Sequence, residues 1–154
     1  MPTDPATPPL ASLFQELILE HYKRPRNRGP LPGADRKVHM NNPTCGDEVL
    51  LQVKLDGDRI DELRFIGEGC SISQSSISMM TELLRGKSRA EAAALARRFT
   101  AMMHGDADAA KDRALGDLRA LAGVSRFPVR VKCALLGWSA LEAALADSGS
   151  ELVE

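Results

Sequence analysis

Aromatic residues are scarce in this chain, with one tryptophan, one tyrosine and four phenylalanines among 154 residues. Proteins that hold single-stranded nucleic acid usually stack the bases on aromatic side chains along a basic groove. With so few aromatics and a formal charge of -1, this chain is not expected to bind nucleic acid. It also lacks the roughly 18 apolar residues in a row that a membrane span needs, and a basic segment followed by an apolar one near its start. We therefore expect a cytoplasmic protein with no membrane partner.

Cysteine is sparse and odd in number, at Cys45, Cys70 and Cys133. Secreted disulfide frameworks usually contain an even number of closely spaced cysteines. We therefore expect reduced thiols, either as metal ligands or as small buried apolar side chains. A chain of 154 residues can bury a core without cross-links, so folding gives the cysteines no obligatory structural task.

The distribution of prolines indicates the limits of the folded part. Residues 1–9 contain four prolines and little that could pack, and this composition is typical of a disordered leader. Residues 10–146 are predicted to form a single domain. Residues 147–154 are predicted to be a flexible tail.

The pattern of apolar residues changes from strand-like to helix-like near the middle of the domain. Two strand-like runs, 48–55 and 60–66, flank a turn sequence typical of a hairpin, and residues 36–40 are expected to add a third strand. An α+β domain is predicted, with a small antiparallel sheet of about three strands packed against several helices. A first helix is predicted from residue 10, before the strands. Four further helices are predicted after the strands, over 71–86, 88–103, 108–123 and 128–146.

The predicted hairpin brings two of the cysteines together. A turn at Asp56 and Gly57 places Cys45 opposite about residue 68, which is close to Cys70. The glycines on either side of residue 68 are expected to allow positive φ angles and a close backbone approach. Cys70 also begins a predicted helix, and the N-terminus of a helix stabilises a thiolate.

Cys133 lies in an early turn of the last predicted helix. The helical pattern gives the buried face to Leu135 and Trp138, so Cys133 is predicted to lie off the centre of that face. Arg130 and Lys132 are its neighbours, and nearby cations favour a thiolate. The local sequence leaves open whether this helix reaches the mouth of the hairpin.

Asp47 gains significance if the three cysteines meet. Three thiolates and one carboxylate suit tetrahedral zinc or an iron–sulfur cluster. A carboxylate is harder and more easily displaced than a thiolate, which indicates a site that can open. The alternative is that Asp47 only caps a turn beside Gly46. His21, His39 and His104 lie in no motif and are interpreted as surface or core histidines.

Three segments of the chain resemble the IscU/SufU family of iron–sulfur assembly proteins, which is also described as NifU N-terminal-like. They are PTCGDEV at 43–49, GEGCSISQSS at 67–76 and RVKCALLGW at 130–138, and the resemblance extends over about residues 10–146. It implies an α+β fold and a ligand set. Lys132 stands where the IscU branch has a histidine, and a helical insertion covers about residues 97–118; both features resemble the SufU branch. The implied ligands are Cys45, Asp47, Cys70 and Cys133.

In the SufU branch these ligands bind zinc, and the resemblance implies that Cys45 accepts persulfide sulfur from a SufS-like, PLP-dependent cysteine desulfurase. Arg130 and Lys132 match basic residues that support this transfer. The implied activity is that of a sulfurtransferase-like relay toward downstream iron–sulfur scaffold or carrier proteins, and not of an independent enzyme. The alternative is a scaffold on which a [2Fe-2S] cluster is assembled and then transferred. A third possibility is a purely structural zinc module.

Overall fold

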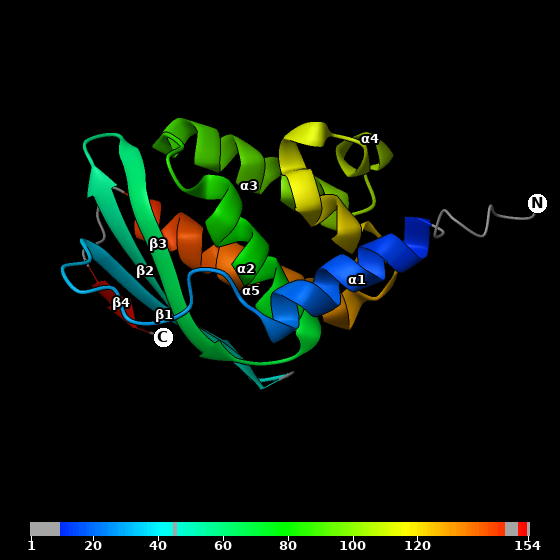
Figure 1. The fold of residues 1–154 in the computed structure, drawn as a ribbon, viewed down its shortest axis with the longest axis horizontal. Coiled ribbons are helices and arrows are strands. Elements are labelled where there is room, and N and C mark those ends of the chain that lie inside the picture. The colour runs from blue at the N-terminus through cyan, green and yellow to red at the C-terminus, as the bar shows by residue number, and fades with distance from the viewer. Residues whose placement is uncertain (1–9, 45, 147–150, 154) are drawn as a thin grey trace, which may run out of the picture.

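The structure is a computed structural model that describes residues 10–44, 46–146 and 151–153. A sheet lies on one side of the molecule, and the helices cover one of its faces (Figure 1). The strand order is β3-β2-β1-β4, and the first three strands are antiparallel neighbours. The predicted α+β class and its antiparallel sheet are therefore confirmed. The strands are β1 (Arg36–Asn42), β2 (Asp47–Asp56), β3 (Arg59–Glu68) and β4 (Glu151–Val153).

The register of the hairpin differs from the predicted one. Glu48 faces Glu68, whereas the prediction placed Cys45 opposite about this residue. The cause is a turn one residue later, with Asp56 paired to Arg59, and an irregularity in the pairing next to Lys54. As a result, the start of β2 lies directly beside the segment that leads from β3 to Cys70.

Both outer edges of the antiparallel sheet are covered by other parts of the chain. Along β3, Gly29 donates its N–H to the carbonyl of Phe65, and Phe65 donates to the carbonyl of Asn27. Along β1, β4 pairs in parallel and uses the groups that would otherwise be open at that edge. Residues 151–153 of the predicted tail thus lie in the sheet. The predicted leader 1–9 and residues 147–150 and 154 lie outside the described residues.

The long helices begin and end where the sequence signals predict. Ser88 and Glu91 form both hydrogen bonds of a capping box, and Pro128 starts the last helix. Gly86, with a φ of 83°, follows the second long helix. None of the described helices combines the length and the apolar character needed to cross a membrane. These helices are α1 (Leu10–Lys23), α2 (Ser71–Leu84), α3 (Arg89–Met103) and α5 (Pro128–Leu145).

The segment predicted as one helix over 108–123 is instead broken into two pieces. A short α4 (Ala107–Ala110) is followed by η1 (Arg113–Arg126), which is a 3-10 helix. Gly116 interrupts η1 with a φ of 54° and a ψ of -130°, a conformation open mainly to glycine. Asp112 accepts a hydrogen bond from the N–H of Ala114 and so starts a new helical segment. Local capping therefore overrides the apolar periodicity that predicted one helix.

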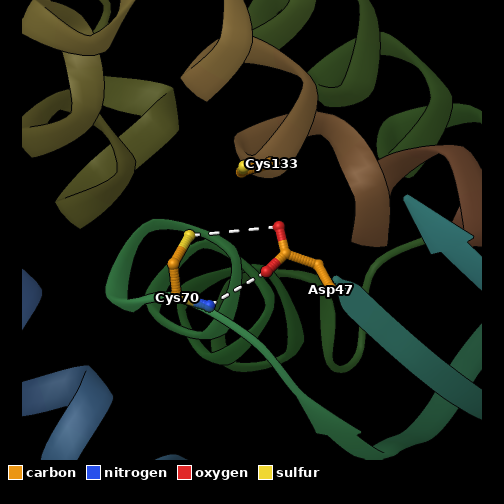
Figure 2. Close-up of side chains that lie close together, drawn as sticks. All are labelled: Asp47, Cys70 and Cys133. Atoms are coloured by element: carbon orange, nitrogen blue, oxygen red, sulfur yellow. Dashed lines mark hydrogen bonds between the residues drawn. The ribbon is translucent and has the colours of Figure 1, made fainter. Parts of the chain in front are cut away.

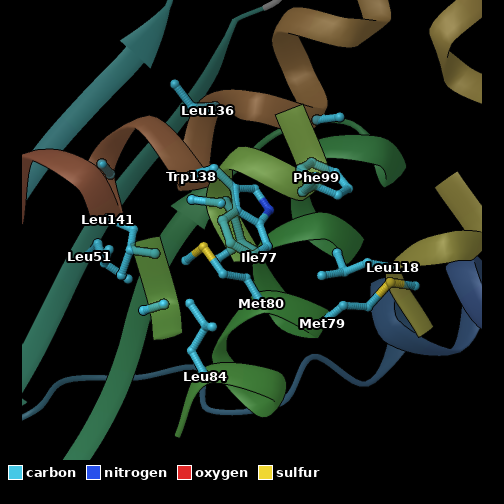
Figure 3. Close-up of a cluster of buried hydrophobic side chains, with 14 of the residues drawn as sticks. Leu51, Ile77, Met79, Met80, Leu84, Phe99, Leu118, Leu136, Trp138 and Leu141 are labelled. Carbon is cyan, nitrogen blue, oxygen red and sulfur yellow. The ribbon is translucent and has the colours of Figure 1, made fainter. Parts of the chain in front are cut away.

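Helix α2 runs through the centre of the helical layer. Its residues from Ser73 to Thr81 are all buried, and Ile77 and Met80 join the core cluster. Figure 3 shows these side chains next to Trp138, whose ring stacks on Phe99 with centroids 5.1 Å apart. On α5, a Cβ at Gly137 would collide with Ile77. This close contact fixes α5 against α2, and both helices carry a cysteine to the same end of the sheet.

Candidate metal centre

Asp47 enters the site from the first position of β2. Before it, the N–H of Gly46 donates to the carbonyl of Asn42 at 2.9 Å, and Gly46 has a φ of 72°. This glycine turn directs the Asp47 carboxyl inward, where only 1% of the residue is exposed. Cys45, which precedes the turn glycine, lies outside the described residues.

Cys70 occupies the N-cap position of α2 and faces Asp47. Its N–H donates to Asp47 Oδ1 at 2.9 Å, and its Sγ lies 3.9 Å from Asp47 Oδ2 (Figure 2). Cys70 itself makes no side-chain cap, so the carboxylate from a distant strand supplies an acceptor at the start of the helix. The interaction fixes the position of one candidate ligand relative to the other.

Cys133 is fully buried, with 0% exposure. The prediction placed it off the centre of the buried face of α5, and the structure corrects this. Helix α5 is packed against α2, η1, β1 and β2 together, so most of its circumference is covered. The Cys133 sulfur points toward Cys70 and Asp47 (Figure 2) and lies 3.6 Å from the carbonyl oxygen of Val129.

Asp47, Cys70 and Cys133 each offer one ligand atom, and these atoms all lie within 4.8 Å of one another. A tetrahedral zinc site has Zn–S and Zn–O distances of about 2.3 and 2.0 Å, which separates its ligands by roughly 3.5–4 Å. Small side-chain rotations would bring the three atoms to these distances. Within the described residues, the buried Asp47 carboxylate has no lysine, arginine or histidine at ion-pair distance. A buried carboxylate between two thiols therefore suits a cation.

The two glycines before Cys70 serve close packing and not an unusual backbone conformation. Neither Gly67 nor Gly69 has a positive φ, so the conformational half of that expectation is wrong. The expected close approach is confirmed, because a Cβ at Gly67 would collide with the carbonyl oxygen of Glu48. A Cβ at Gly69 would collide with Asp47 Oδ1. These glycines allow β2 and the start of α2 to bring their ligands together.

Ser73 is a neighbour of the site that the sequence reasoning missed. Its Oγ lies 3.9 Å from Cys70 Sγ and donates to the carbonyl of Cys70 at 3.1 Å. Gln74 donates from Nε2 to the same hydroxyl oxygen at 3.3 Å. The signal was present in the sequence, because a residue three positions after a helix N-cap faces back toward it.

Within the described residues, the remaining candidates do not belong to this ligand group. Arg130 and Lys132 are exposed on the first turns of α5. Among the described residues, no histidine joins Asp47 and the two cysteines. His21 is instead buried at 1% exposure and lies 2.7 Å from the hydroxyl of Ser78 through Nδ1, which agrees with its interpretation as a core histidine.

The fold and the site together define a small α+β domain with a candidate cysteine–aspartate metal centre where the sheet meets two helices. The chain belongs to the family of NifU-like N terminal domains, whose sequence profile matches residues 13–150.

Named relatives cover nearly the whole chain. It is 49% identical over 138 residues to the "Zinc-dependent sulfurtransferase SufU" of Bacillus subtilis, with 89% of this chain and 92% of the relative covered. It is 45% identical over 141 residues to the "Iron-sulfur cluster assembly scaffold protein IscU" of Streptococcus pyogenes, with 92% and 87% covered. A solved structure described as a candidate iron–sulfur cluster assembly scaffold (FiSufU) from Fervidobacterium islandicum has a TM-score of 0.80 and 35% identity, covering 90% of this chain and all of that one. The resemblance to the IscU/SufU family is therefore confirmed.

Proposed function

We propose that this protein is a zinc-dependent sulfur acceptor for iron–sulfur cluster assembly. It takes persulfide sulfur on Cys45 from a SufS-like, PLP-dependent cysteine desulfurase and passes it to a downstream scaffold or carrier. The observation that carries the proposal is the convergence of Asp47, Cys70 and Cys133, whose ligand atoms lie within 4.8 Å although they are far apart in the sequence. The name of the Bacillus subtilis relative, a zinc-dependent sulfurtransferase, supports the same activity.

The sulfur transfer balances without an oxidant or a reductant. The Cys45 thiolate attacks the outer sulfur of a cysteine persulfide on the desulfurase. A new S–S bond forms on Cys45 while the original S–S bond breaks, and the desulfurase cysteine leaves as a thiolate. The transferred sulfur keeps its oxidation state, and any proton on it travels with it.

The donor set of Asp47, Cys70 and Cys133 fits a zinc ion, and we propose Cys45 as its fourth ligand. When bound, zinc would keep the thiols ionised at neutral pH and moderate their nucleophilicity. Asp47 is the hard donor of the set and the one most easily exchanged. Its Oδ1 also accepts the Cys70 N–H, so the carboxylate keeps the start of α2 in position whether or not its other oxygen is a ligand.

Arg130 and Lys132 are proposed to support the transfer and not to bind metal. Both are exposed on the helix that carries Cys133. Their positive charge next to the site stabilises anionic sulfur as it arrives. It also favours the approach of a partner surface that carries the opposite charge.

The Cys45→Ser substitution tests the acceptor role. The wild type is expected to stimulate a PLP-dependent cysteine desulfurase and to gain sulfur on the peptide that contains Cys45, as read by mass spectrometry. Cys45→Ser is expected to lose both effects, because a hydroxyl does not attack persulfide sulfur at neutral pH. Ser139→Ala, an exposed change on α5, serves as the matched control. Full stimulation by Cys45→Ser would contradict the proposal.

The second candidate is a scaffold on which a [2Fe-2S] cluster is built and handed on. The name of the Streptococcus pyogenes relative favours it, and the same ligands could hold a cluster. Lys132 disfavours it, because a lysine stands where a histidine could have been a further ligand. Metal and sulfide analysis after anaerobic purification separates the two: zinc without sulfide supports the acceptor, and iron with acid-labile sulfide supports the scaffold.

A further inference from the structure

A groove of about 840 Å³ lies where α1, the start of α2, the end of η1 and the start of α5 meet. Its floor and walls are mostly apolar. The apolar side chains that line it include Phe14, Ile18, Ile72, Val124 and Phe127. Apolar surface of this extent is costly to leave in water, and on a folded domain it usually marks a binding site.

Phe127, which lines the groove, is followed at the start of α5 by a second exposed apolar residue, Val129, which is not among the lining residues. Phe127 is 60% exposed and Val129 is 56% exposed, the highest values among the large apolar residues whose exposure the structure describes. They stand on either side of Pro128, which is held at the first position of α5. A proline at this position restricts the backbone between the two residues.

The groove lies directly beside the candidate metal centre. Ser71 and Ile72, which line it, follow Cys70 in the first turn of α2. Arg130, on its other side, lies one turn before Cys133 on the same helix. A molecule seated in the groove would therefore lie next to Cys70 and within one helical turn of Cys133.

The charge around the groove has one sign. Arg126 and Arg130 line it, and no carboxylate is found among its described lining residues. Neither arginine forms an ion pair within the described part of the chain, whereas Arg24 is paired with Glu20. A complementary occupant therefore carries a carboxylate next to an apolar side chain.

We propose that this groove receives a surface loop of the sulfur-donating desulfurase, with an apolar side chain flanked by an aspartate or glutamate. The inference rests on the proposed function and names the docking surface for it. Transfer between two cysteine sulfurs requires the reacting atoms to approach to about 3–3.5 Å, so the partner has to cover the surface next to the centre. The groove is the apolar and cationic part of that surface, which suits a loop rather than a flat contact.

The test measures desulfurase stimulation as a function of the concentration of this protein. The doubly substituted Phe127→Ala/Val129→Ala variant is expected to raise the half-saturating concentration about tenfold or more, because buried apolar anchors dominate interfaces. Arg126→Glu is expected to raise the half-saturating concentration as well. Added salt should weaken the binding of the wild type to the desulfurase but not the binding of this variant. Maximal stimulation and zinc content should match the wild type, because none of these residues is a candidate ligand.

Ile66→Ala is the matched control, since Ile66 is 41% exposed and lies on β3, outside the groove. The half-saturating concentration of this variant should stay within about twofold of the wild-type value. Groove variants that behave like this control, or that lower only maximal stimulation, would overturn the docking surface. So would a monomer–dimer equilibrium of the wild type that the groove substitutions abolish, because a second copy would then be the occupant. If the wild type stimulates no desulfurase, the proposed function fails first, and the two failures are distinguishable.

Discussion

Asp47 combines a structural and a chemical role in one buried side chain. Oδ1 accepts the N–H of Cys70 at 2.9 Å, and Oδ2 lies 3.9 Å from the Cys70 sulfur. Burial of a carboxylate is unfavourable unless hydrogen bonds or a cation compensate for the lost water. One oxygen thus holds the start of α2, and the other is available as a ligand.

Two substitutions of Asp47 separate these roles. Asp47→Asn keeps an oxygen acceptor for the Cys70 N–H but loses the anionic ligand. Metal release to a chelator should therefore be about tenfold faster or more. The stability of the metal-free protein should be nearly unchanged. Asp47→Ala also leaves that buried N–H without an acceptor and should lower the free energy of unfolding by about 1–3 kcal/mol. Chelator kinetics and urea unfolding measure the two effects. Wild-type metal release from both variants would show that the carboxylate is only a turn residue.

At the scale of the elements, His21 connects α1 to α2 and η1. Its Nδ1 lies 2.7 Å from Ser78 Oγ on α2, and its Nε2 lies 3.6 Å from Asp117 on η1 and 4.0 Å from Glu82 on α2. Burial, with a contribution from Arg26, lowers the pKa of His21 below its ordinary value, although Glu82 and Asp117 act in the opposite direction. The connection therefore depends on a neutral imidazole.

This lowered pKa predicts a loss of stability on acidification. Above the ordinary histidine pKa of about 6.5, His21 is neutral in the folded and the unfolded chain. As the pH falls below this value, His21 is protonated in the unfolded chain before it is protonated in the folded chain. The contribution of His21 to the free energy of unfolding therefore falls with the pH until the pH passes the pKa of His21 in the folded chain. His21→Gln cannot titrate, so the stability difference between wild type and variant should be constant at higher pH and shrink as the pH falls below about 6.5. Urea unfolding of the metal-free proteins gives this difference, and parallel pH curves would refute it.

At the scale of the whole molecule, the candidate centre joins parts of the chain that are remote in sequence. Asp47 begins β2, Cys70 precedes α2, and Cys133 lies on α5. The unfolded chain has no preformed site of this kind, so a metal that binds only the folded state stabilises it. A metal bound by these residues would therefore cross-link the sheet and the helical layer.

Removal of the metal is consequently expected to destabilise the entire domain. At a free metal concentration of 100 to 1,000 times Kd, binding contributes about 3–4 kcal/mol, which corresponds to a Tm shift of roughly 5–15 °C. Scanning calorimetry with and without a strong chelator measures it. Cys133→Ser should have a lower Tm that the chelator hardly changes. An unchanged wild-type Tm after verified loss of metal would contradict a cross-linking role.

Much of this architecture is encoded locally and could be predicted. The capping box at Ser88, Pro128 at the start of α5 and the apolar alternation of β2 act within a few residues. Local reasoning failed where two local signals compete, as in η1, where Gly116 and Asp112 interrupt an apolar pattern that favours one helix. It also failed for the hairpin register, because the turn lies one residue later than predicted and the irregularity next to Lys54 shifts the pairs beyond it once more.

The sequence by itself determined the residue types of the candidate centre and their order, since the spacing of Asp47, Cys70 and Cys133 within three motifs is a property of the chain alone. Only the tertiary structure decided that Cys133 turns inward and meets the other two. That meeting depends on how α5 packs, and a Cβ at Gly137 would collide with Ile77 of α2. Such a contact joins residues 60 positions apart (77 and 137), and no local pattern encodes it, because its energy depends on shapes that exist only once both helices are in place.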